Sequence, residues 1–91
     1  MNIEQVRRNI DQLDSMIVAL LAKRTDLVTV AASLKKNEQA VRDPRRVAQV
    51  IAGVRQKAEH YGLDPDIAER TYRTLIDCLL QKELSLFRKD G

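Results

Sequence analysis

Apolar residues recur every three or four positions along the first third of the chain, and this stripe constrains the fold most strongly. Its members are Ile3, Val6, Ile10, Leu13, Ile17, Leu20, Leu27, Ala31 and Leu34. Neither Gly nor Pro interrupts it, so it predicts one helix from about Ile3 to about Lys36. That helix would be roughly 50 Å long, whereas a compact domain of 91 residues is about 25 Å across. A second chain running alongside is the simplest way to cover the stripe.

Two Asp-Pro pairs, at residues 43–44 and 64–65, predict the starts of two further helices. Asp is a favoured N-cap residue, and Pro is favoured at the first helical position. The sequence therefore predicts a second helix over 44–61, which Gly62 ends, and a third helix over 65–87. The polar segment KKNEQAVRD ahead of the first pair is expected to interrupt the helical pattern.

The fold class is predicted to be all-α, with one long and two shorter helices in a single domain spanning residues 1–91, because no stretch alternates like a strand. The apolar runs are short and the first ten residues lack a hydrophobic signal core, so neither export nor membrane insertion is expected. The single thiol, Cys78, allows no disulfide framework, and we expect a cytoplasmic protein. The net charge of +3 is spread along the chain and argues against a nucleic-acid partner.

Cations occupy or border the long apolar stripe. Arg24 stands at a stripe position, and Lys35 lies about 20° from it around the helix and about 16 Å further along the axis. Arg7 lies at the edge of the stripe, roughly 25 Å from Arg24. Arg7 can therefore approach a small ligand held by Arg24 only if it comes from a second, antiparallel chain. This pattern predicts a site shared between subunits.

Glu83 interrupts the apolar stripe of the third predicted helix. Burial disfavours a charged carboxylate, so this group is expected either to hold a proton or to lie near a cation. Arg46 opens the second helix beside Asp43, where a cation opposes the helix dipole and favours an anionic partner. One misplaced charge is commonly a packing or helix-end device. Several unpaired buried charges are costly, so together they favour a site that binds an anion.

The spacing of these residues resembles that of the all-helical chorismate mutase family, the AroQ class. The stretch RRNIDQLDSMIVALLAKR is similar to the opening helix of that family, which carries a second Arg seventeen residues after the first. Lys35, the segment VRDPRRV and the turn GLDP also fall where the family has counterparts. The resemblance covers nearly the whole chain. It implies an intertwined homodimer with two equivalent sites that need no metal or other cofactor.

The resemblance also implies roles for the misplaced charges. Arg7 of the neighbouring subunit and Arg24 would bind the two carboxylates of a dianionic substrate. Lys35 would contact a carboxylate and the ether oxygen of the breaking bond. Glu83 would replace the residue, often Gln, that donates a hydrogen bond to this oxygen, and each such donor is worth about 3 kcal/mol by analogy with oxyanion holes.

At the residues expected around the substrate's ring hydroxyl, the resemblance points to two different kinds of enzyme. Arg46 and the Asp43 region would surround this hydroxyl. Val47 stands where well-known bacterial mutases have a Glu that touches it, and Leu79 stands where they have a Ser. The loop with Pro44 and Val47 more closely resembles that of the isochorismate-pyruvate lyases. Those enzymes use the same set of cationic side chains around the substrate to form salicylate and pyruvate.

The leading hypothesis is a chorismate mutase, which rearranges chorismate to prephenate in the biosynthesis of aromatic amino acids or related secondary metabolites. An isochorismate-pyruvate lyase is the first alternative. A mutase acting on the 4-amino analogue of chorismate is the second, because Glu83 resembles the residue of some such enzymes. A non-catalytic helical dimer that binds a partner or an acidic ligand for regulation is the alternative from another class.

Overall fold

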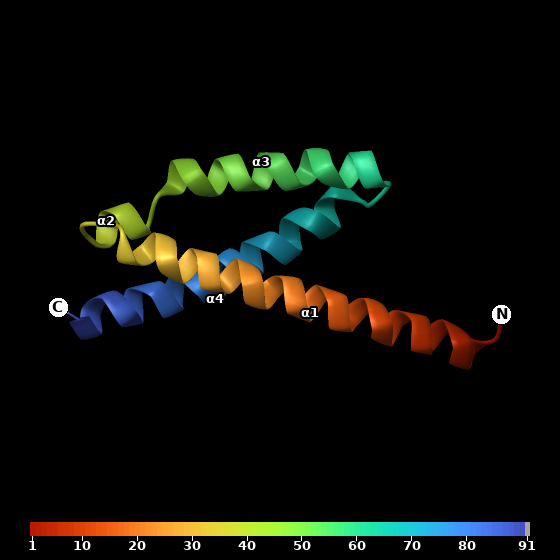
Figure 1. Ribbon diagram of the computed structural model, residues 1–91. Helices are drawn as coiled ribbons and strands as arrows, with labels where there is room; N and C mark the ends of the chain where they lie inside the picture. The colour runs from red at the N-terminus through yellow and green to blue at the C-terminus, as the bar shows by residue number, and fades with distance from the viewer. Residues whose placement is uncertain (91) are drawn as a thin grey trace. The chain divides into compact units, whose positions relative to one another are not determined.

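The computed structural model describes residues 1–90 and the side chains of residues 1–88, and its regular structure over this range is entirely helical (Figure 1). This confirms the all-α fold class. The helices are α1 (Ile3–Ser33), α2 (Glu38–Val41), α3 (Pro44–Tyr61) and α4 (Pro65–Asp90). The chain separates into two compact parts, residues 1–31 and the residues from Ala32 onward. Each part is considered by itself, and the single domain over 1–91 stays a prediction.

Helix α1 begins with two reciprocal hydrogen bonds. The backbone N–H of Gln5 donates to Oδ1 of Asn2 over 2.9 Å, and the backbone N–H of Asn2 donates to Oε1 of Gln5 over 3.0 Å. This is a capping box, which satisfies donors that a helix start leaves free. The 31 residues of α1 extend about 46 Å. None of them is buried, because a single straight helix cannot cover its own apolar stripe.

The end of the first helix was predicted at about Lys36, and this is wrong by three residues. Helix α1 ends at Ser33, and the backbone N–H of Lys35 donates to the carbonyl of Ala32 in a turn. Asn37 adopts an extended conformation (φ −157°, ψ 173°), and its side chain accepts the backbone N–H of Ala40 over 2.9 Å. A cap residue needs a non-helical conformation, so Asn37 ends one helical pattern and starts another.

Helix α2 lies within the polar segment that was expected only to interrupt the pattern. It is one turn long, and it carries Val41, which is buried. Residues of α2 pack against α4. The segment is polar in composition, but the buried Val41 and the cap made by Asn37 stabilise one helical turn within it.

The start of α3 and the turn that follows it were predicted correctly. The backbone N–H of Arg46 donates to Oδ1 of Asp43 over 3.2 Å, with Pro44 at the first turn. Gly62 ends α3 in the left-handed region (φ 72°), and the N–H of Leu63 donates back to the carbonyl of Ala58 over 2.8 Å. This C-cap is the conformation that favours glycine.

Helix α4 starts as predicted and extends three residues beyond the predicted end at Phe87, to Asp90. Asp64 accepts the backbone N–H of Asp66 on its side chain over 2.9 Å. The three-residue connection between α3 and α4 makes the two helices a hairpin (Figure 1). None of the described helices is long and apolar enough to span a membrane.

Helices α3 and α4 pack through a small apolar core. Val54 and Ala58 of α3 are buried with Ala68 of α4, and Val50 and Tyr72 pack against them. Small side chains at such a contact allow two helices to approach closely. The core fixes α4 against α3 in the first half of α4.

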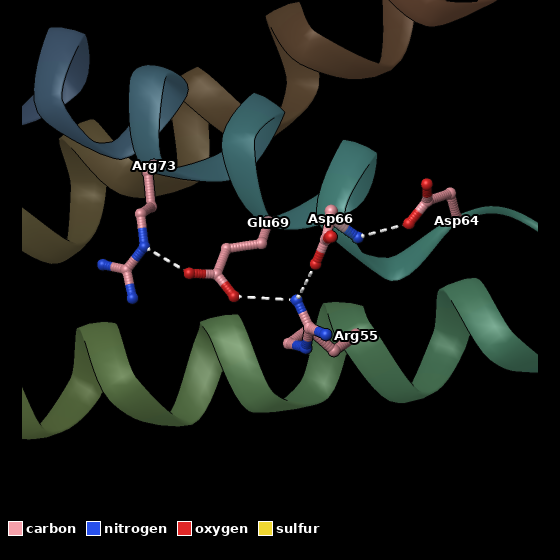
Figure 2. Close-up of polar contacts among 5 residues, drawn as sticks. All are labelled: Arg55, Asp64, Asp66, Glu69 and Arg73. Carbon is pink, nitrogen blue, oxygen red and sulfur yellow. Dashed lines mark hydrogen bonds and ion pairs between the residues drawn. The ribbon is translucent and has the colours of Figure 1, made fainter.

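An ion-pair network borders this hairpin on its polar side (Figure 2). One nitrogen of Arg55 on α3 donates to Asp66 and to Glu69 of α4, each over 3.0 Å, and Arg73 donates to Glu69 over 2.7 Å. The hydrogen bond to Asp66 raises the pKa of Arg55. The hydrogen bond from Arg73, helped by that from Arg55, lowers the pKa of Glu69. The ion-pair network and the apolar core therefore both hold α3 against α4.

Candidate active site

Glu83 lies on the buried side of α4, as its position in the apolar stripe predicted. Only 8% of its surface is exposed, and the neighbouring Leu84 is buried as well. Its Oε2 atom accepts no hydrogen bond from any residue that the structure describes. A buried polar atom without a hydrogen bond is costly and is commonly satisfied by a ligand or water.

Lys35 supplies the cation beside this carboxyl group. Its Nζ lies 3.7 Å from Oε2 of Glu83, which is an ion pair but is longer than a hydrogen bond. Lys35 lies in the turn after α1, so the prediction that it continues the stripe of the first helix is wrong. Lys35 and Glu83 both belong to the part of the chain from Ala32 onward, so their contact does not follow from the helical period of α1.

Asp43 and Arg46 are brought together at the start of α3, but through the backbone of Arg46. Oδ1 of Asp43 accepts the N–H of Arg46 as the helix cap. The side chain of Arg46 is exposed and remains available to an anion. The capping role fixes where the Arg46 side chain leaves the helix.

Val47 on α3 and Leu79 on α4 are both partly buried apolar residues. Neither side chain can donate or accept a hydrogen bond to a substrate hydroxyl. Their proposed place beside the ring of the substrate stays a prediction.

Arg7 and Arg24 both belong to α1, where Arg7 is exposed and Arg24 is partly buried. Seventeen residues of helix separate them by about 25 Å. One chain therefore cannot bring both guanidinium groups to one small ligand along this helix. Their joint role stays a prediction that needs a second chain.

Two residues near Lys35 and Glu83 were not predicted. Nε of Arg88 on α4 donates to Oε1 of Glu38 on α2 over 2.9 Å. The Asn-Glu pair at 37–38 carried a signal, because Asn is a good cap and an acid suits the first turn. The partner of Glu38 is 50 residues away in the chain, and no local pattern reveals such a contact.

The described residues hold no group of three or more metal-ligating side chains. The part of the chain from Ala32 onward offers a buried carboxyl group, a lysine ammonium group next to it, and the exposed Arg46. Cationic side chains of this kind can bind and orient an anion through charge-assisted hydrogen bonds. Arranged at a developing negative charge, the same donors lower a reaction barrier.

Comparison with known proteins identifies the class of protein. Residues 6–84 match the model of the chorismate mutase type II family. The match spans most of the chain, and the chain belongs to this family. The protein is therefore an all-helical enzyme of the chorismate mutase family, as its sequence pattern indicated.

Three individual relatives carry three different names. An isochorismate pyruvate lyase of Pseudomonas aeruginosa is 30% identical over 87 residues, which cover 96% of this chain and 86% of that protein. A chorismate mutase of Methanocaldococcus jannaschii is 25% identical over 76 residues, covering 82% of this chain and 77% of that protein. The T-protein of Enterobacter agglomerans is 33% identical over 72 residues, which cover 78% of this chain but 19% of that longer protein.

Proposed function

We propose that the protein is a chorismate mutase that converts chorismate to prephenate. The observation that carries the proposal is the Lys35–Glu83 pair: a buried carboxyl oxygen without a hydrogen bond lies 3.7 Å from an ammonium group. Membership of the chorismate mutase type II family supports the same substrate. An oxygen atom of the substrate would accept a hydrogen bond from Lys35, and from Glu83 when its carboxyl group carries a proton.

The proposed reaction is an internal rearrangement. One C–O ether bond of the substrate breaks while one C–C bond forms, and no atom enters or leaves. No nucleophile is needed, so the enzyme has two tasks. It holds the reactive conformer, and it stabilises negative charge on the ether oxygen as the C–O bond breaks.

Lys35 and Glu83 would perform the second task. The ammonium group of Lys35 donates to the ether oxygen, and Glu83 donates to it when its carboxyl group carries a proton. Arg24, with Arg7 of a partner subunit, would bind the two substrate carboxylates. Asp43, Arg46, Val47 and Leu79 would surround the ring.

We further propose that the active form is an intertwined homodimer. The support is the long α1, whose apolar stripe its own helix leaves uncovered. Two such helices packed antiparallel would bring Arg7 of one chain near Arg24 of the other. The site would then be complete only in the dimer.

Isochorismate-pyruvate lyase is the second candidate function. The relative from Pseudomonas aeruginosa supports it, because it carries that name and aligns with nearly the whole chain. The apolar Val47 and Leu79 support it too, since neither can hydrogen-bond the ring hydroxyl. Elimination from isochorismate uses the same binding of two carboxylates and the same charge on the ether oxygen.

Incubation of the purified protein with chorismate tests the main proposal. Accelerated formation of prephenate supports it. A folded protein that leaves chorismate at its uncatalysed rate contradicts it.

A further inference from the structure

Two ion pairs join the same short segment to α4. Lys35 pairs with Glu83, and three residues further on Glu38 pairs with Arg88. On α4 the two partners are five residues apart. The segment from Lys35 through α2 therefore contacts the C-terminal half of α4 at two charged points, and Val41 of α2 is buried.

The two ion pairs differ in how tightly they are made. In the Glu38–Arg88 pair, Nε of Arg88 donates a hydrogen bond of 2.9 Å to Oε1 of Glu38. In the Lys35–Glu83 pair the separation is 3.7 Å, and Oε2 of Glu83 accepts no hydrogen bond from the described residues. The Glu38–Arg88 pair (the outer pair) therefore makes a direct hydrogen bond between the segment and α4. The Lys35–Glu83 pair (the inner pair) leaves Oε2 of Glu83 able to take part in a hydrogen bond with a ligand.

The segment needs such a connection, because it has little structure of its own. Lys35 lies in a turn outside any helix, and α2 is a single turn, far shorter than a helix that persists in isolation. Glu38 of α2 forms an ion pair with Arg88 of α4, which adds to the packing of α2 against that helix.

The order of the charges also favours the observed register of this contact. Along the segment a cation, Lys35, comes before an anion, Glu38. Along α4 the anion Glu83 comes before the cation Arg88. A shift that brought Lys35 toward Arg88 would place like charges together, which is unfavourable.

We propose that Glu38 and Arg88 are positioning residues, which act on the reaction only by holding Lys35 beside Glu83. The inference rests on the proposed function, which assigns the reaction to Lys35 and Glu83. Loss of the outer pair leaves the free enzyme with Lys35 out of place for part of the time. Substrate, which itself bridges Lys35 and Glu83, restores the arrangement on binding.

Kinetics of single and paired variants test the proposal. Arg88→Gln and Glu38→Gln each raise KM about two- to fivefold while kcat stays at the wild-type value, because an exposed ion pair shifts a population only modestly and substrate binding restores it. The double variant Glu38→Arg with Arg88→Glu returns KM toward wild type. Arg73→Gln is the matched control, since Arg73 is also an exposed arginine of α4 in a hydrogen-bonded ion pair, and it leaves KM unchanged.

Hydrogen exchange gives a readout that does not depend on activity. The backbone N–H of Arg42 donates to the carbonyl of Glu38, and that of Val41 to the carbonyl of Asn37. These amides exchange faster in Arg88→Gln than in wild type or Arg73→Gln. Unchanged exchange, an unchanged KM, or a charge-reversed pair that does not recover overturns the proposal. A wild-type enzyme that turns over neither chorismate nor isochorismate contradicts the proposed function, and the exchange rates then decide alone whether the pair holds the segment.

Discussion

Nζ of Lys35 lies 3.7 Å from Oε2 of Glu83, close enough for charge attraction and too far for a hydrogen bond. An oxygen atom of a ligand can accept a hydrogen bond from Lys35, and from Glu83 when its carboxyl group carries a proton. The Lys35–Glu83 pair therefore unites a turn after α1 with a helix late in the chain in one anion-binding arrangement, and the account of function depends on it.

Replacement of Lys35 removes the proposed donor to the ether oxygen. We expect Lys35→Ala to lower kcat by about 10²- to 10³-fold, the usual effect of losing one such donor. The neighbouring Lys36→Ala is the matched control and is expected to keep wild-type kcat. Steady-state kinetics on variants of equal helicity and mass measure both. A Lys35→Ala enzyme with near-normal kcat would exclude this role.

Replacement of Glu83 by two different residues tests whether it donates a hydrogen bond to the substrate. The amide N–H of Gln can donate such a bond, whereas the methyl group of Ala cannot. We expect Glu83→Gln to keep a higher kcat than Glu83→Ala, and steady-state kinetics measure both. An equal loss of kcat in the two variants would count against Glu83 as a donor.

Mixing two inactive variants tests whether Arg7 acts across a dimer. We expect Arg7→Ala and Glu83→Ala each to be inactive, because each variant damages both sites of its homodimer. After unfolding and refolding together, a mixed dimer has one site with Glu83 of the first chain and Arg7 of the second, both intact. Random pairing in a symmetric dimer then restores about one quarter of wild-type activity. A mixture as inactive as its components would place Arg7 in the site of its own chain.

The lowered pKa of Glu69 makes the stability of the α3–α4 hairpin depend on pH. This pKa is lowered in the folded chain from its usual value of 4.5, chiefly by the hydrogen bond from Arg73. The stabilisation is therefore complete above that usual value and is lost as pH falls through the lower folded pKa. We expect thermal unfolding of wild type and Glu69→Gln, at one protein concentration, to differ at neutral pH and to converge in acid.

Glu59→Gln provides the control for this titration. Glu59 is an exposed glutamate of α3 outside the network of Figure 2. We expect its replacement to leave the pH dependence of unfolding unchanged. A wild-type curve that runs parallel to that of Glu69→Gln down to acid pH would show that the network adds no pH-linked stability.

The helix boundaries that the sequence predicted correctly depend on local chemistry. Asp43 caps α3 with its own side chain, and Gly62 ends it in a conformation that other residues avoid. The burial of Glu83 was predictable as well, because its place follows from the helical period of α4. Each of these features is decided within a few residues of chain.

The features that the sequence did not predict depend on contacts between distant residues. Asn37 caps a helix inside a polar segment, and the burial of Val41 stabilises that helix. The composition of the segment does not reveal this burial. The position of Lys35 beside Glu83 results from the turn and not from the stripe of α1. The Glu38–Arg88 pair joins residues 50 positions apart. Arg7 and Arg24 stay a prediction because they would meet only through a second chain.

The most direct test is a side-by-side assay of the wild-type enzyme on chorismate and isochorismate, with Lys35→Ala as the reference for lost catalysis. We expect prephenate from chorismate, formed far faster by wild type than by Lys35→Ala. A folded enzyme that forms salicylate from isochorismate and leaves chorismate unchanged, or that accelerates neither reaction, would contradict it.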